Sequence, residues 1–435
     1  MAAKDKPIRY EERRTYAIAI GDAWRVLADT DHLNRAIGLP AVDFSPLEGG
    51  ELVRRARAKA YGVVPVRWRE FPFDWIRERR YAVRREFESG PIAWLVGGVE
   101  FEPAGDGTAV TSYATFQPRN VAGRFAWKLG RAPVHGLLEF CDRYLARIAA
   151  GKADPVPVPA RRPVVDRRQL ERMLDALRRE PLEPRLVELL NERILEGSDD
   201  QLTRVRPYAL ADLWHEDRTQ VLRLFLHAAR AGLFEPGWQL MCPNCRVPKA
   251  EVAELADLPP RFHCDTCGIW YTVDLERNLE LRFSVAPAVR ATRDEIYCIG
   301  GPLRMPHVVA QQYLAPHEDR PVELAVGENL QLRTIGSTQE LNLVPGPAGR
   351  TTEMKVTYAA GRWSGPHSLE TEGTLTVPHG AVLTLRNQTD GHVLALVETL
   401  ARTRDATTLE DVRRLDEFDD LLDEDAIARA SRLTA

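Results

Sequence analysis

The amino-acid sequence predicts a multidomain α+β protein, and three observations lead to that prediction. The chain has 435 residues, more than one ordinary hydrophobic core accommodates. Two C-x2-C pairs of cysteines stand near its middle. Helical and strand-like segments mix before these cysteines, whereas short segments of alternating polarity follow them, separated by Gly and Pro. We therefore expect several domains of different composition.

The expected boundaries follow these changes of pattern. The linker is marked by four prolines in a charged setting, which favour an extended and semi-rigid chain. The expected parts are an α+β domain over 1–151, a proline-rich linker over 152–168, a helical winged-helix-like segment over 169–237, a zinc ribbon over 238–278, a β-sandwich over 279–405 and an acidic C-terminal helix over 406–435.

The first domain begins with strand-like alternation over 15–20, followed by a helix from Asp22. Five further strand-like segments are separated by turn residues such as Gly, Pro and Asp. A long segment with an apolar stripe at helical spacing closes the domain. The five predicted strands span 50–60, 64–70, 75–88, 92–103 and 108–118, and the closing helix spans 121–150.

That order resembles the START-like or polyketide-cyclase-like helix-grip superfamily. The phrase over 22–33 is similar to the first helix of that superfamily, and Gly105-Asp-Gly-Thr108 is similar to a late hairpin turn. The resemblance implies a curved sheet that grips the last helix around an apolar cavity. Such a cavity commonly holds a lipid, aromatic or polyketide-like ligand, so we expect a small apolar ligand as a partner.

Aromatic and acidic residues of this domain are the candidate contacts for that ligand. We expect the cavity wall to contain Trp68, Glu70, Phe73, Trp75, Trp94, Tyr113 and Trp127. The alternative interpretation is that most of these rings are ordinary core side chains. If the domain is an enzyme, Glu70, Asp74 and Tyr113 are its candidate acid–base groups. A row of arginines is expected on the outer face of a strand: Arg77, Arg79, Arg80, Arg84 and Arg85.

The cysteine array predicts a structural zinc ribbon. Two C-x2-C pairs separated by eighteen residues let four thiolates converge on one tetrahedral Zn²⁺, which leaves no open position for water. A pair of disulfides and a dithiol redox site are the alternatives. His263 is expected to be a neighbour of the site and not a fifth ligand. The four predicted ligands are Cys242, Cys245, Cys264 and Cys267.

Composition narrows the possible functions. The N-terminus is charged, and no apolar run is long enough to span a bilayer, so we expect a cytoplasmic protein without a membrane partner. Residues 1–150 carry 24 Lys and Arg against 19 Asp and Glu, which is too mild an excess for a nucleic-acid surface. Cys141 and Cys298 are expected to be buried thiols outside the array.

Several phrases after residue 165 carry a second resemblance. This region is similar to a domain of unknown function that lies upstream of the catalytic domain in certain bacterial class III adenylate/guanylate cyclases. The metal-binding aspartates and the nucleotide-binding residues of such a catalytic domain are not found after Phe418. The phrases span 206–214, 262–268, 281–285 and 385–389, together with the cysteine array.

Three functions therefore remain open. The first is a non-catalytic sensor that binds a small apolar ligand and regulates a cyclase or another output partner. The second is an enzyme of the polyketide cyclase or hydratase type, which requires its acid–base groups to point into the cavity. The third is a nucleic-acid binder that uses the winged-helix-like segment and the ribbon.

Overall fold

The computed structural model describes most of the chain. The described residues are 6–46, 52–60, 62–125, 127–152, 154–156, 163–243, 246, 248–253, 257–264, 269–272, 278–324, 326–335, 337, 339–348, 353–366, 369–371, 373–379, 381–400 and 405–418. The chain divides into two compact units, each made of two stretches of sequence. Unit 1 contains Met1–Cys141 and Ile296–Arg402, and unit 2 contains Asp142–Glu295 and Thr403–Ala435.

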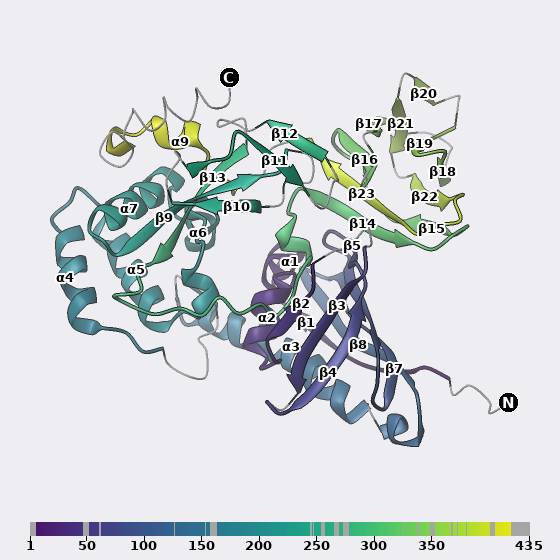
Figure 1. Ribbon diagram of the computed structural model, residues 1–435, viewed down its shortest axis with the longest axis horizontal. Coiled ribbons are helices and arrows are strands. Elements are labelled where there is room, and N and C mark those ends of the chain that lie inside the picture. Colours follow the sequence, from purple (N-terminus) through teal and green to yellow (C-terminus); the bar gives the residue numbers. More distant parts are fainter. Residues whose placement is uncertain are drawn as a thin grey trace. The chain divides into compact units, whose positions relative to one another are not determined.

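The first stretch of unit 1 has the predicted order of strands, short helices, a meander and a long helix (Figure 1). Its first strand begins seven residues earlier than predicted, at Ile8, and ends at Tyr16, before the helix that begins at Ile20. The elements are β1 (Ile8–Tyr16), α1 (Ile20–Leu27), α2 (Thr30–Ala36), β2 (Val42–Phe44), β3 (Arg54–Ala60), β4 (Val64–Glu70), β5 (Asp74–Ile76), β6 (Arg80–Phe87), β7 (Ile92–Ala104), β8 (Gly107–Pro118), η1 (Val121–Phe125) and α3 (Trp127–Ala149).

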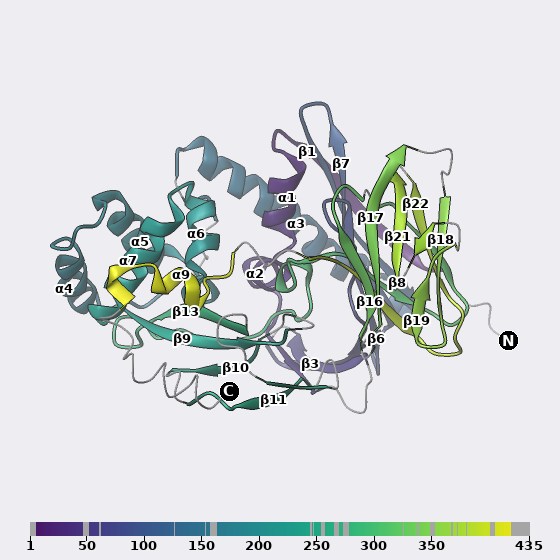
Figure 2. The ribbon, with the colours of Figure 1, turned by 90° about the horizontal axis from the view of Figure 1, so that it is seen from above.

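These strands form an antiparallel sheet with the order β1-β8-β7-β6, and both β4 and β5 pair with β6. One face of this sheet, which we call the inner face, packs against the helices (Figure 2). The Tyr81 hydroxyl donates to the carbonyl of Leu27 over 2.6 Å, and the Tyr16 hydroxyl donates to that of Leu138 over 3.1 Å. Because side chains alternate along a strand, Val83 and Arg85 share the inner face with Tyr81.

The second stretch of unit 1 contributes two packed sheets with a shared core, built from residues such as Leu332, Leu343, Val356 and Leu385. One of these sheets continues the first one, because β14 pairs with β5. The elements are η4 (Pro302–Arg304), β14 (Val308–Leu314), β15 (Asp319–Val322), β16 (Leu330–Thr334), β17 (Glu340–Ala348), β18 (Glu353–Ala359), β19 (Arg362–Ser364), β20 (Glu370–Thr371), β21 (Thr374–His379), β22 (Val382–Asn387) and β23 (Val393–Thr399).

Unit 2 packs helices against a small sheet with the order β10-β9-β13. Asp166 and Asp217 cap two of its helices, and prolines begin two others, as helix-start rules predict. Its elements are α4 (Arg167–Leu177), α5 (Pro184–Glu196), η2 (Asp199–Leu202), α6 (Pro207–Trp214), α7 (Arg218–Arg230), β9 (Phe234–Met241), β10 (Pro248–Val252), β11 (Arg261–Cys264), β12 (Ile269–Thr272), β13 (Leu279–Val285), α9 (Leu409–Arg413) and η5 (Asp416–Phe418).

Two predicted boundaries differ from this arrangement. β13 was expected to open the β-sandwich, but it pairs with β9 along its whole length and belongs to unit 2. The acidic helix expected over 406–435 is a short helix that ends at Arg413, followed by a 3-10 turn, and residues 419–435 lie outside the described part. Among the described residues, no helix has both the length and the apolar composition that crossing a bilayer requires.

Candidate functional site

A buried carboxylate lies on the inner face of the unit 1 sheet. Glu70 is the last residue of β4, stands opposite Arg85 of β6 and is only 4% exposed. Trp68 lies two residues earlier and therefore shares its face. The indole Nε1–H of Trp68 donates to Glu70 Oε2 over 2.9 Å, and the Nε–H of Arg85 donates to the same oxygen over 2.8 Å. Two donors thus hold one oxygen of the carboxylate.

The other carboxylate oxygen has no such partner. Glu70 Oε1 is buried, and no described residue lies within hydrogen-bonding distance of it. Burial lowers the pKa of Arg85, but the neighbouring Glu70 carboxylate outweighs this effect, so the pKa of Arg85 is raised overall. A charged guanidinium thus faces the carboxylate. A buried acceptor without a partner is costly, so a donor from outside the chain that reached Oε1 would gain a strong hydrogen bond.

Aromatic rings surround this part of the inner face. Trp24, Tyr81 and Phe101 form a cluster of edge-to-face and tilted pairs with centroids 5.5–6.3 Å apart, and Phe73 adds a further contact to Tyr81 at 6.4 Å. Burial raises the pKa of Tyr81, whose hydroxyl is already bound to Leu27. Tyr81 is therefore a neutral packing residue with an occupied hydroxyl, and Glu70 carries the open polar atom.

A buried thiol from the second stretch of unit 1 reaches the same region. The Thr30 hydroxyl of α2 donates to Cys298 Sγ over 3.2 Å. Burial and, next, the negative charge of Glu70 raise the pKa of Cys298 to about 12, so it remains a neutral thiol. The backbone N–H groups of Tyr297 and Cys298 both donate to Asp31 Oδ1 over 2.8 Å. We call Ile296–Gly301, which α2 holds through these contacts, the strap.

The structure places four of the predicted ligand contacts on the inner face. Trp68, Glu70 and Phe73 lie there together, and Trp75 stands opposite Tyr81 in the strand register. The indole Nε1–H of Trp75 donates to the carbonyl of Val308 over 3.2 Å, so this N–H group already has an acceptor in β14. The side chain of Trp127 lies outside the described part of the structure.

Trp94 and Tyr113 lie on the opposite, outer face of the sheet. Trp94 stands opposite Glu86, and the Arg84 guanidinium lies over its ring at 4.9 Å. The ring of Tyr113 lies over Gly98, where a Cβ atom would come within 2.7 Å of the Tyr113 hydroxyl. Neither ring faces Glu70.

Asp74 also lies on the outer face, because it stands opposite Ala82 in the register. Its Oδ1 accepts the N–H of Tyr313 over 2.6 Å, and Arg320 lies 3.1 Å from its Oδ2. Desolvation raises the pKa of Asp74 in spite of the Arg320 charge. The three candidate acid–base groups, Glu70, Asp74 and Tyr113, are therefore not brought together.

Two members of this site were not predicted. Arg85 was expected on the outer face with Arg84, and that expectation was wrong, because adjacent residues of a strand point to opposite faces. Strict alternation in β6 was the signal that would have found it. Cys298 was predicted to be buried, which is confirmed, but nothing in the sequence placed it beside Thr30.

The structure describes two of the four predicted zinc ligands. Cys242 directly follows β9 and Cys264 ends β11, and both are fully buried in the core of unit 2. Cys245 and Cys267 lie outside the described residues. Within the described residues, no group of three or more His, Cys, Asp or Glu side chains is arranged to hold a metal ion.

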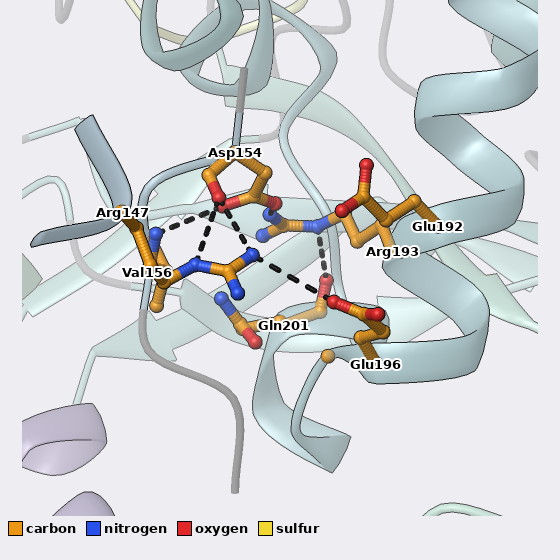
Figure 3. A pocket seen from close by; sticks show the side chains of 8 residues that line it. Arg147, Asp154, Val156, Glu192, Arg193, Glu196 and Gln201 are labelled. Carbon is orange, nitrogen blue, oxygen red and sulfur yellow. Dashed lines mark hydrogen bonds and ion pairs between the residues drawn. The ribbon is translucent and has the colours of Figure 1, made fainter. Parts of the chain in front are cut away.

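A small polar cavity in unit 2 lies between α5 and the segment after α3 (Figure 3). Arg193 pairs with the carboxylate of Asp154, and the Nη2–H of Arg147 donates to the carbonyl of Asp154 over 2.9 Å. The cavity measures about 10 Å³, which is room for one water molecule. The ion pair between Asp154 and Arg193 holds this part of the predicted linker against α5. The cavity itself is too small for a ligand.

Two family models match separate parts of the chain. Residues 7–150 match the family described as "Polyketide cyclase / dehydrase and lipid transport", which confirms the first resemblance. Residues 167–295 match the "Family of unknown function (DUF5939)", and that match ends well before residue 435. No curated protein matches the chain.

Among solved structures, the ZhuI aromatase/cyclase from a Streptomyces species is 18% identical to this chain and has a TM-score of 0.26. The alignment covers 34% of this chain and 99% of the ZhuI chain. A protein from Thermus thermophilus is 22% identical and has a TM-score of 0.24, and the alignment covers 33% of this chain and 99% of that protein. Norcoclaurine synthase from Thalictrum flavum is 12% identical and has a TM-score of 0.25, and the alignment covers 32% of this chain and 93% of that protein. The similarity of residues 7–150 to the polyketide cyclase, dehydrase and lipid-transport family rests on the family match.

Proposed function

We propose that the inner face of the unit 1 sheet binds a small, largely apolar molecule that carries one hydrogen-bond donor. The observation that carries this proposal is the Glu70 carboxylate, whose Oε2 is held by Trp68 and Arg85 while its buried Oε1 has no partner among the described residues. A hydroxyl or N–H group of the ligand would donate to Oε1. The family similarity of residues 7–150, with lipid transport in its description, supports a ligand of this class.

The surroundings of Glu70 favour an apolar body for this ligand. The rings of Trp68 and Phe73 are buried on the same face, and Cys298 is a neutral thiol there. Apolar and aromatic walls with few polar groups are typical of small-molecule sites, because the walls supply affinity and the polar groups fix orientation. A ligand that carried a charge would lose its hydration without a partner for that charge, so we expect it to be neutral.

The test uses two probes with the same ring system, of which one can donate a hydrogen bond and the other cannot. 2-Naphthol carries a hydroxyl, whereas 2-methoxynaphthalene has the same rings and cannot donate. We expect the full chain to bind 2-naphthol at least tenfold more tightly, as a strong buried hydrogen bond implies, and Glu70→Gln to remove most of this preference. Glu102→Gln, on an exposed strand residue, is the matched control. Equal affinities for both probes in the unmodified chain would overturn the proposal.

Of the three candidate acid–base groups, Glu70 is the one that lies on this face. Asp74 and Tyr113 lie on the outer face, so they are not positioned to act on the same molecule. A carboxylate with one open oxygen is able to accept a proton as well as a hydrogen bond. Turnover of a bound hydroxyaromatic substrate that is lost in Glu70→Gln would favour catalysis over binding.

We propose further that unit 2 holds one structural zinc ion through Cys242, Cys245, Cys264 and Cys267. The support is the spacing of the four cysteines and the complete burial of Cys242 and Cys264 in one core. Cysteine thiolates are preferred zinc ligands, and a site made of four of them is closed to water and therefore structural. Regulation of a nucleotide cyclase and binding to nucleic acid stay predictions that rest on the sequence alone.

A further inference from the structure

Exposed apolar side chains gather at one end of the unit 1 sheet. Val63 and Val64 are 77% and 50% exposed, and Val121 and Phe125 are 67% and 62% exposed. The first two lie at the turn between β3 and β4, and the other two lie in η1. Side chains of this size are rarely left in water in adjacent segments without a use.

Strand pairing brings these segments to the same end of the sheet. Trp68 stands opposite Phe87, so the start of β4 runs alongside the turn that follows β6. η1 adjoins that turn as well, because the N–H of Arg119 donates to the carbonyl of Pro91 over 2.8 Å. The Arg119 guanidinium also donates to the carbonyl of Gly90 over 3.2 Å. We call the described residues of these segments, 59–60, 62–67, 88–91 and 118–125, the apolar end.

The charges of the apolar end are nearly all positive. These residues include four basic ones, Lys59, Arg67, Arg119 and Arg124, and a single acid, Glu88. Lys59, Arg67 and Arg119 are exposed, and none of them pairs with a carboxylate of the described residues. Exposed apolar side chains with exposed basic side chains in the same segments match the chemistry of an anionic lipid bilayer, in which the apolar groups enter the acyl boundary and the cations meet the headgroups.

We propose that the apolar end binds peripherally to membranes that contain anionic lipids. Val121 and Phe125 enter the bilayer surface on one side and Val63 and Val64 on the other, while Arg67 and its basic neighbours meet the phosphates. A soluble acidic protein would satisfy the charges but not the protruding valines and phenylalanine. This inference concerns the outside of the fold and does not depend on which molecule Glu70 binds.

Vesicle co-sedimentation of the full chain tests this proposal. We expect binding to vesicles of phosphatidylcholine with about a third phosphatidylglycerol, little binding to phosphatidylcholine alone, and loss of binding at high salt. The variant Val121→Ser/Phe125→Ser leaves the charge unchanged and is expected to bind about tenfold more weakly. Arg67→Glu is expected to weaken binding roughly fivefold or more. Val164→Ser, at a 90% exposed valine of unit 2, is the matched control.

Three results would overturn the proposal: no binding to anionic vesicles, equal binding by the serine variant and the unmodified chain, or equal weakening by the control. A self-association that the serine variant abolishes, without vesicle binding, would assign the surface to a second copy of the chain. Unchanged thermal unfolding shows that the variants are folded. If Val121→Ser/Phe125→Ser unfolds, Val63→Ser/Val64→Ser in the other turn makes the same test.

Discussion

Arg85 Nε lies 2.8 Å from Glu70 Oε2, and the two residues stand opposite each other on neighbouring antiparallel strands. The Glu70 side chain is almost fully buried, and the Arg85 side chain is about one-fifth exposed. Each charge therefore depends on the other for compensation, because little water reaches them. This dependence makes the pair a sensitive position for mutation.

Replacing Arg85 with Met is expected to lower the free energy of unfolding of unit 1 by about 3–5 kcal/mol, because Glu70 is left buried with an uncompensated charge. The double variant Glu70→Gln/Arg85→Met is expected to recover much of this loss, since it removes both charges. Urea unfolding followed by tryptophan fluorescence measures both values. A double variant no more stable than Arg85→Met would contradict this account of the pair.

The strap is expected to shield Cys298 from alkylation. Asp31 Oδ1 accepts two backbone N–H groups of the strap, so Asp31→Asn weakens two charge-assisted hydrogen bonds. We expect the rate of Cys298 labelling by N-ethylmaleimide to rise about tenfold, as the loss of about 1.5 kcal/mol implies. Peptide mapping by mass spectrometry separates this thiol from the other five. Asp43→Asn, on an exposed side chain, serves as the control, and an unchanged rate in Asp31→Asn would refute the protection.

The pairing of β5 with β14 is expected to depend on Gln312. Its buried Nε2–H₂ group donates to the carbonyls of Trp75 and Gln311 over 3.0 and 2.7 Å. Gln312→Ala removes both of these hydrogen bonds and is expected to cost about 1–3 kcal/mol of unfolding free energy. The comparison is Gln331→Ala, whose side chain bonds only to Glu340 at the surface. Equal stability of the two variants would show that the pairing of β5 with β14 does not depend on Gln312.

Unit 2 is expected to lose stability in acid through Glu280. This carboxylate is buried and accepts hydrogen bonds from Arg206 over 2.6 Å and from Arg282 over 3.1 Å. Burial alone would raise the pKa of Glu280, but the two guanidinium charges outweigh burial and lower it. Its contribution is therefore complete above the ordinary glutamate pKa and is lost as the pH falls through the lowered value.

Urea unfolding between about pH 6 and pH 3 measures this loss, since the slope of stability against pH reports the protons taken up on unfolding. Glu280→Gln is expected to be less stable at pH 6 and to have a shallower slope. Glu235→Gln, on an exposed residue of β9, is expected to keep the full slope. A Glu280→Gln variant with the unmodified slope would assign the acid sensitivity to other groups.

Metal removal is expected to unfold part of unit 2. Elemental analysis should find one zinc ion per chain, and a strong chelator should lower the melting temperature of unit 2, because metal binding to a structural site contributes folding free energy. Cys242→Ser is expected to lose the metal, whereas Cys141→Ser, on α3, should retain it. A purified chain without zinc, or a Cys242→Ser variant that keeps it, would eliminate the ribbon.

Local patterns predicted much of unit 1. β4 has the predicted bounds because its alternating residues lie between turn residues, and β7 and β8 differ from their predictions by one residue at one end. Trp68, Glu70 and Phe73 lie together on the inner face, whereas Trp94 and Tyr113 lie on the outer face. Trp94 and Tyr113 were assigned to the cavity as large aromatic residues, and size alone does not say which side of a strand a ring occupies.

Contacts between distant parts of the chain were beyond prediction. The sequence separates Asp31 from Tyr297 by 266 residues and Trp75 from Val308 by 233. The hydrophobic pattern of β14 does not indicate that it pairs with β5, because such a pattern identifies a strand but not the strand beside it. β13 was misassigned for the same reason. Its apolar run fits either sheet, and its pairing with β9 determines that it belongs to unit 2.

β5 is only three residues long, and it has β6 on one edge and β14 on the other. A fragment cut after residue 150, where the family similarity ends, would bare the second edge of β5 together with Trp75 and the α2 surface that holds the strap. Exposed strand edges recruit other chains, so such a fragment is expected to aggregate or exchange strands. We therefore expect the border of the family similarity to differ from the border of independent folding, so that expression of unit 1 alone requires both of its stretches of sequence.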